Sequence, residues 1–429
     1  DINHYFSDFL KLEHIFNDRD VLRPEFMPST LPHRDIEIQK IAEIVACTLK
    51  NSMPSNIFRF GKTGTGKTAV VRYVKERLAD QCHQLTIQEP RWVFLNCQQV
   101  NTGYRILARI CEDLDPADPI PIAGWPIDVV LEKVITKLDT YIHGVCFLVL
   151  DEIDILVRNA SKNNDGILYN LARINERLKN ARVGIIGISN VLNFKSLLDP
   201  RVLSSLSEEE IIFPAYNAMQ LKDILEQRAE LAFHHSALDS DVIPLCAALA
   251  AKEHGDARKA LDLLRKAGEL AERRNSSRVT QDYLYLAQDD IEKDKTREYC
   301  DGLPIQLKTV LLSIYQMQKH QGDREIITGD VYNCYAELQN KIPGLNKLTQ
   351  RRVSELIREL DLSGLVNARV RSSGRYGRTK FIKMNIPIED AYKYLANERL
   401  FSNVIECRPS CINKSERSYY NGLAFKKIF

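Results

Sequence analysis

Long apolar runs are missing from this sequence. No stretch of its 429 residues approaches the roughly 20 apolar residues that cross a bilayer, so we expect no membrane attachment. The opening Asp1-Ile2-Asn3-His4 lacks the basic segment and apolar core of a secretory signal, so we expect no export. Internal repeats and low-complexity segments are also missing, so a repeat architecture is not expected.

Paired cysteines and a large net charge are missing as well. The ten cysteines form no C-x-x-C pair, and most of them lie among apolar residues. Cys407 and Cys411 are close in sequence but have no second pair, which argues against a metal site there. Reduced, buried thiols favour a cytoplasmic protein. The net charge of +2 allows a nucleic-acid surface only as a local patch.

One stretch, residues 61–68, fits the pattern G-x-x-x-x-G-K-[ST] at every fixed position. The short aromatic segment before it, residues 56–60, is predicted to be a strand, and residues 69–78 after it are predicted to be a helix. Glycines let the backbone turn with positive φ, and N–H groups at a helix N-terminus form an anion site. The alternative is an ordinary glycine-rich turn. The predicted nucleotide-binding residues are Gly61, Lys62, Thr63, Gly64, Thr65, Gly66, Lys67, Thr68 and Ala69, with Lys67 on the β- and γ-phosphates and Thr68 on Mg²⁺.

A continuous apolar run, residues 145–150, is typical of a strand buried on both faces of a parallel sheet. It ends in Asp151-Glu152. Ligands bind at the carboxyl ends of the strands in open α/β folds, so both carboxylates are expected beside the phosphate loop. We predict that Asp151 coordinates Mg²⁺ and that Glu152 orients and polarises the attacking water. A strand end solvated by acidic residues is the alternative.

Strand and helix patterns alternate from residue 36 to residue 213. This alternation predicts an α/β domain with a parallel sheet and right-handed crossovers. The predicted strands are residues 56–60, 91–96, 145–150 and 183–188, and the predicted helices are residues 36–49 and 168–179, with two more in residues 101–142.

Three polar residues further along are candidate partners of a γ-phosphate. Asn190 follows the last predicted strand, where an Asx turn is the alternative. Arg201 follows an Asp-Pro turn and is a candidate arginine finger acting on nucleotide in a neighbouring subunit. Arg258 lies at a helix start and could reach back to the γ-phosphate. For each of the two arginines, the alternative is an ordinary surface cation without a role at the phosphate.

The pattern changes twice after residue 214. A helical segment comes first, and then helices with two strands around a glycine-containing tip, which is typical of a winged helix. A chain of this length is expected to hold two or three domains. The predicted domains are an α/β ATPase domain at 1–214, an all-α lid domain at 215–295 and a winged-helix domain at 296–400, with the tail at 401–429 unassigned.

The predicted wing is strongly basic. Residues 366–383 contain six Arg or Lys and no Asp or Glu, a local charge of +6 in a chain of net +2. A helix-turn-helix pattern precedes it, so we predict DNA binding, with a solvated edge hairpin as the alternative. Its predicted DNA-binding residues are Gln350, Arg351 and Ser354 on the second helix and Arg371, Arg375, Tyr376, Arg378 and Lys380 on the wing, with Arg375 and Tyr376 aimed at the minor groove.

Taken in order, these motifs resemble the archaeal origin-recognition initiators, a family of AAA+ ATPases related to the eukaryotic origin recognition complex. The resemblance covers roughly residues 10–400 and includes Leu31-Pro32-His33-Arg34 before the first helix and Gly124-Trp125-Pro126 in an insertion. It implies that Pro32, His33 and Arg34 lie near the adenine, that residues 103–127 contact DNA, and that Asn190 and Arg258 sense the nucleotide. Two residues depart from the family pattern: Arg59 in the strand before the phosphate loop, and Val191 after Asn190.

The resemblance also implies a function. It predicts a slow ATPase that switches between ATP and ADP with Mg²⁺, binds double-stranded origin DNA at the nucleoid, and helps load the replicative helicase. Its further partners would be other initiator subunits or paralogues. Two alternatives remain at this point: an ATP-driven AAA+ or STAND-type transcription or signalling regulator, and a catalytically silent DNA-binding partner.

Overall fold

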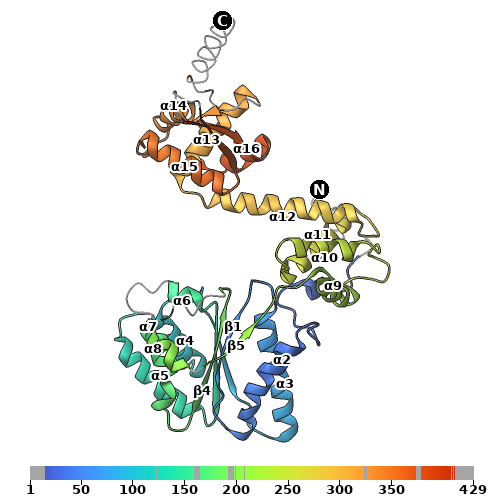
Figure 1. Ribbon diagram of the computed structural model, residues 1–429, viewed down its shortest axis with the longest axis vertical. Coiled ribbons are helices and arrows are strands. Elements are labelled where there is room, and N and C mark those ends of the chain that lie inside the picture. Colours follow the sequence, from blue (N-terminus) through green and yellow to red (C-terminus); the bar gives the residue numbers. More distant parts are fainter. Residues whose placement is uncertain are drawn as a thin grey trace, which may run out of the picture. The chain divides into compact units, whose positions relative to one another are not determined.

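The computed structural model forms two compact units, Asp1–Gln288 and Asp289–Phe429 (Figure 1). No helix in the part of the chain that the structure describes is long and apolar enough to cross a bilayer. The structure describes residues 15–121, 123–158, 165–191, 198, 200–206, 208–322, 326–372, 378–406, 408 and 410.

A five-stranded parallel sheet forms the centre of the first unit. Its strand order is β2-β3-β4-β1-β5, and all four pairings are parallel. This confirms the predicted parallel α/β fold, and it adds an edge strand that the acidic sequence Glu-Glu-Glu-Ile-Ile did not indicate. The strands are β1 Asn56–Phe60, β2 Arg91–Asn96, β3 Val145–Asp151, β4 Arg182–Ser189 and β5 Glu208–Ile212.

Helices cover both faces of this sheet (Figure 1). In β3, Cys146, Leu148 and Leu150 face one hydrophobic cluster, while Val145, Phe147 and Val149 face the other. This alternation explains why the strand is apolar at every position. The helices are α2 Asp35–Val45 and α3 Lys67–Leu85 on one face, and α4 Gly103–Leu114, α5 Ile127–Tyr141, α7 Asp165–Ala172 and α8 Pro200–Leu206 on the other, with the short α6 Asp154–Arg158 after β3.

Two predicted helices end earlier than expected. The helix expected over residues 36–49 is α2 followed by a 3₁₀ segment, Ala46–Lys50. The helix expected over residues 168–179 ends at Ala172, because hydrogen bonds from side chains stabilise a turn in the residues that follow. Asn175 exchanges two hydrogen bonds with the backbone of Val183, and the Asp139 carboxylate accepts three backbone N–H groups of residues 179–181.

The first unit also contains a helical lid. The lid consists of α9 Ala218–Ala232, α10 Val242–Lys252, α11 Ala257–Arg273 and the start of α12 Gln281–Asp301, together with residues 15–22. Residues 15–22 pack on α9 and α11, and Phe16 pairs with Phe233. The chain therefore crosses between the lid and the sheet twice, through a crossing segment (residues 23–34) and a linker (residues 213–217).

The second unit is a winged helix. Its three-stranded antiparallel sheet has the order β6-β8-β7. The hydrophobic core continues past residue 400, because Phe401, Val404 and Ile405 are buried in it. Its elements are α13 Ile305–Gln321, β6 Ile326–Ile327, α14 Thr328–Gln339, α15 Gln350–Leu362, β7 Val366–Ser372, β8 Arg378–Met384, α16 Ile388–Ala396 and a 3₁₀ turn Arg399–Phe401.

Candidate nucleotide-binding site and DNA-binding surface

The phosphate loop connects β1 to α3, which begins at Lys67. Gly64 and Gly66 have φ of +71° and +86°, values that favour glycine. A Cβ on Gly61 would lie 2.5 Å from the backbone oxygen of Phe213, so this glycine is required by a close approach. The loop therefore presents its backbone at a helix N-terminus, as an anion site needs.

Lys67 is buried at the centre of the site. Its Nζ donates to the oxygens of Gly61 and Lys62, both at 2.7 Å, and to Oδ1 of Asn190 at 2.9 Å. Burial lowers the pKa of Lys67 to about 8, an effect that the nearby Asp151 opposes. The lysine thus links the phosphate loop to the end of β4, the two places where the sequence predicts γ-phosphate contacts.

The residues predicted to hold Mg²⁺ fit that ion. The Thr68 hydroxyl donates to Oδ2 of Asp151 at 2.8 Å, so two oxygen ligands converge on one point. Mg²⁺ is usually held by one or two carboxylates together with substrate phosphates and water. Among the described residues no cluster of three or more His, Cys, Asp or Glu could hold a metal by itself.

Glu152 occupies an unusual position beside Asp151. Its φ is +56°, which is rare for a residue with a side chain. Its Oε2 is buried and has no hydrogen-bond partner among the described residues. Burial, then the negative charges of Asp151 and Asp154, raise the pKa of Glu152. A strained backbone, an unpaired oxygen and a raised pKa often occur together at functional sites.

Asp154 orients the end of β4, a role that sequence reasoning missed. Its Oδ1 accepts from the Ser189 hydroxyl at 3.0 Å and from the Asn190 backbone N–H at 3.3 Å. The buried carboxylate therefore fixes the backbone from which the Asn190 side chain projects. The acidic segment Asp151-Glu152-Ile153-Asp154 could have indicated this role, because its last residue lies on the first turn after the strand.

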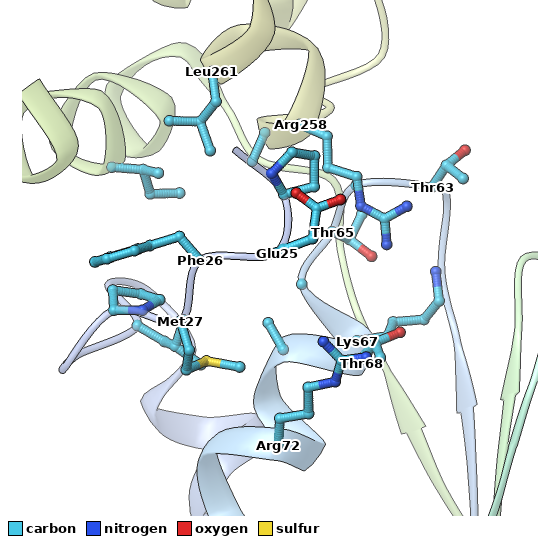
Figure 2. Close-up of a pocket in the computed structure, with 18 of the residues that line it drawn as sticks. Glu25, Phe26, Met27, Thr63, Thr65, Lys67, Thr68, Arg72, Arg258 and Leu261 are labelled. Atoms are coloured by element: carbon cyan, nitrogen blue, oxygen red, sulfur yellow. The ribbon is translucent and has the colours of Figure 1, made fainter. Parts of the chain in front are cut away.

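A cavity of about 460 Å³ lies between the phosphate loop and the lid (Figure 2). This volume is within the range of small-molecule sites. Lys67, Thr68, Asp151, Glu152 and Asn190 line one end of it. The other end is mostly apolar and is formed by the crossing segment and the lid, namely Pro24, Glu25, Phe26, Met27, Pro28, Leu31, Pro32, Ile224, Gln227, Arg228 and Leu261.

Arg228 holds the apolar end in place, and nothing in the local sequence indicated this. Its Nη1 donates to the backbone oxygen of Val21 at 2.9 Å and its Nη2 to that of Phe26 at 3.1 Å. The guanidinium also lies 4.7 Å from the centre of the Phe26 ring. Burial lowers its pKa to about 10, so it remains charged at neutral pH.

The three residues expected near the adenine divide into two groups. Pro32 lines the cavity, whereas His33 and Arg34 are not among its lining residues. The His33 ring pairs with Asp223 of α9 at 2.7 Å. Arg34 is 2% exposed and donates to the backbone oxygens of Thr65 and Pro214 at 3.0 and 2.8 Å.

The two candidate arginines lie in different places. Arg258, on the first turn of α11, points into the cavity (Figure 2). Asp256 caps this helix by accepting from the N–H of Arg258 at 2.9 Å. Arg201 is exposed on α8 and is not among the residues that line the cavity.

Arg59 is fully buried in β1. Its Nη1 donates to the backbone oxygen of Lys67 at 2.8 Å, while its Nε and Nη2 have no partner among the described residues. Its guanidinium lies 5.8 Å from the centre of the Phe213 ring. Burial lowers its pKa to about 9, against the attraction of Asp151, so a positive charge lies directly behind the phosphate loop.

The candidate DNA surface is on α15 and the wing. Gln350 and Arg351 are exposed at the start of α15, which the Thr349 side chain caps. Lys380 on β8 turns toward α15, and its Nζ donates to the Ser354 hydroxyl at 3.1 Å. Of the other predicted wing residues, Arg371 and Arg378 lie in β7 and β8 with side chains outside the described part, and Arg375 and Tyr376 lie outside the described residues altogether.

Three family models match the chain in sequence order. An AAA domain matches residues 52–193, a Cdc6 AAA+ ATPase-type lid domain matches 222–289, and a CDC6 C-terminal winged helix domain matches 298–394. These matches cover the phosphate end of the cavity, its lid residues and the candidate DNA surface, whereas the crossing segment lies outside them.

Relatives and solved structures match over nearly the whole chain. The ORC1-type DNA replication protein of Pyrococcus horikoshii is 48% identical over 92% of this chain and 93% of its own length. That of Methanoculleus marisnigri is 50% identical over 87% of this chain and 88% of its own. The structure of the Aeropyrum pernix ORC1 protein in complex with DNA has a TM-score of 0.76 at 42% identity, covering 91% of this chain and 99% of that one. The chain therefore belongs to the ORC1-type DNA replication proteins, the AAA+ replication initiators of archaea.

Proposed function

We propose that this initiator binds ATP with Mg²⁺, hydrolyses it slowly, and uses the bound nucleotide to control its hold on duplex origin DNA and on the replicative helicase. One observation carries the nucleotide part: Lys67 bonds Asn190 while Thr68 bonds Asp151, at the phosphate-loop end of the cavity. The family assignment sets aside the regulator alternative.

The cavity suits ATP along its length. The phosphate loop, Lys67 and Arg258 offer backbone N–H groups and cations for the phosphates. Phe26, Met27 and Pro32 offer apolar contacts for a base at the other end. When bound, Mg²⁺ would be held by Thr68 and Asp151 and would neutralise phosphate charge.

Glu152 is the proposed general base. It lines the phosphate end of the cavity, and its raised pKa makes its carboxylate a better proton acceptor from water. Asn190 and Arg258 would contact the γ-phosphate from the core and the lid. Arg201, exposed on α8, would act in a neighbouring subunit.

DNA contact is proposed at two surfaces, one on each unit. On the winged helix, Gln350, Arg351 and Ser354 would enter the major groove, while Lys380 and the arginines of the wing contact phosphates or the minor groove. In the first unit, the candidate surface is the insertion at residues 103–127, which contains Trp125. Its side chain is 39% exposed, and its ring centre lies 5.1 Å from the Lys133 ammonium. The related Aeropyrum pernix protein, solved in complex with DNA, supports this proposal.

Fluorescence anisotropy with origin and scrambled duplexes tests the DNA part. We expect tighter binding to the origin duplex, and about a tenfold or greater loss for Arg351→Ala. Arg278→Ala, an exposed arginine of the lid, is the matched control and should bind as wild type does. Equal affinity for both duplexes, together with no effect of Arg351→Ala, would remove sequence-directed DNA binding from the proposal.

Helicase recruitment is tested with the same preparations. A pull-down of the replicative helicase by DNA-bound protein should depend on whether ATP or ADP is present. Capture that is identical with both nucleotides, and with none, would rule out nucleotide control of this partner.

A further inference from the structure

The linker between sheet and lid packs directly on glycine backbone. A Cβ on Gly66 would lie 2.9 Å from the Tyr216 hydroxyl, and one on Gly255 would lie 2.2 Å from the Tyr216 backbone oxygen. Gly61 approaches Phe213 equally closely. The glycines of the phosphate loop and Gly255 of the lid therefore lie so close to the linker that no side chain would fit between them. A displacement of the phosphate loop or of the lid at Gly255 would consequently displace the linker as well.

Arg34 joins the phosphate loop to this linker. Its Nε donates to the Thr65 backbone oxygen at 3.0 Å and to the Tyr216 hydroxyl at 2.9 Å. The guanidinium also stacks on Tyr216, 3.9 Å from the ring centre. The single Nε–H is shared between these two partners, while Nη2 of the same planar guanidinium donates to the Pro214 backbone oxygen of the linker at 2.8 Å. The side chain is buried, so these bonds are shielded from water.

The same contacts extend to Arg258, the lid residue that lines the phosphate end of the cavity. Gly255, against Tyr216, is followed by Asp256, the cap of α11. The Ala257 N–H donates to the Gly64 backbone oxygen at 3.2 Å, which fixes the start of α11 on the phosphate loop. Arg258 is the next residue and projects into the cavity (Figure 2).

We propose that Arg34 and Tyr216 are positioning residues that hold Arg258 over the phosphate end of the cavity. They act on the nucleotide through Arg258 and transmit the state of the phosphate loop to the lid. This inference rests on the proposed binding of nucleotide in this cavity. Tyr216 also lines the cavity, so direct contact with the nucleotide is the competing explanation that a test must separate.

A double-mutant cycle between Tyr216 and Arg258 makes this separation. The four proteins are wild type, Tyr216→Phe, Arg258→Ala and the double variant, and the measurements are kcat and KM for ATP and the release rate of a fluorescent ADP. We expect Tyr216→Phe to lower kcat about five- to tenfold, the effect of one lost buried hydrogen bond. In the Arg258→Ala background the same change should have no further effect. Equal fold-changes in both backgrounds, or no change from Tyr216→Phe alone, would overturn the inference.

Two further variants keep the result interpretable. Arg34→Lys retains the charge but loses the planar guanidinium, and we expect it to reproduce Tyr216→Phe, again only when Arg258 is present. Tyr73→Phe removes a tyrosine hydroxyl from α3 beside Arg77, at a residue that does not line the cavity, and should behave as wild type. If wild type binds no nucleotide, the proposed function fails and this inference with it. If wild type binds and hydrolyses ATP but the effects of Tyr216→Phe and Arg258→Ala are additive, this inference is refuted and the proposed function stands.

Discussion

The Lys67 ammonium lies 2.9 Å from Oδ1 of Asn190, a bond that spans 123 positions in the sequence. It connects the lysine of the phosphate loop to the strand end that Asp154 fixes. The bond holds the Asn190 amide beside the phosphate loop, at the phosphate end of the cavity.

Replacing Asn190 with Ala should slow hydrolysis by about 100-fold, the usual cost of removing one group that stabilises a transition state. ADP affinity should change little, because the phosphate loop and the apolar end remain. Single-turnover hydrolysis and ADP titration measure the two effects. A parallel loss in both would mean that Asn190 supports the loop as a whole.

Glu152→Gln should abolish most hydrolysis, by about 100-fold or more, while ATP still binds. A general base must be ionised. Because burial raises the pKa of Glu152, the acid limb of the pH–rate profile should lie above the usual glutamate range. The rate should therefore fall as pH decreases through this raised pKa, and the residual rate of the variant should lack that limb. An unchanged rate in Glu152→Gln would assign the base to another group.

Arg59→Met is expected to separate stability from function. A buried charge with unpaired donors is costly, so an apolar side chain of similar length should leave the free energy of unfolding unchanged or raise it by about 1 kcal/mol. Nucleotide affinity should fall, because the positive charge behind the phosphate loop is lost. Thermal unfolding and ADP titration check this. A destabilised variant with normal affinity would show that Arg59 serves packing alone.

Phe401→Ala should destabilise the winged helix by about 3–5 kcal/mol, since Phe401 is fully buried. Gln316 anchors the same segment by donating to the Val404 backbone oxygen at 3.3 Å. DNA binding should be lost at lower temperature than in wild type. Leu400→Ala, at a neighbouring side chain that is 43% exposed, is the matched control and should cost little.

Local patterns predicted the fold and the phosphate end of the site. The glycine spacing, the apolar run and the two carboxylates are patterns of neighbouring residues, so they can be recognised without knowing which distant residues meet in the fold. The contacts of Arg34 and Arg228 with Pro214 and Phe26 could not be predicted, because these partners lie some 180 to 200 positions away in the sequence. The edge strand β5 was missed for a similar reason: only its pairing with β1 makes a strand of three glutamates and two isoleucines. The core beyond residue 400 is likewise visible only once α13 is in place.

The two crossings between sheet and lid, residues 23–34 and 213–217, have a mechanical consequence. The two crossings are bonded to each other, because Arg34 at the end of one donates to the Pro214 backbone oxygen in the other at 2.8 Å. The lid also meets the phosphate loop directly, where the Ala257 N–H donates to the Gly64 oxygen. A rotation of the lid against the sheet would therefore strain both crossings together, and a wide opening would have to break the bond between Ala257 and Gly64.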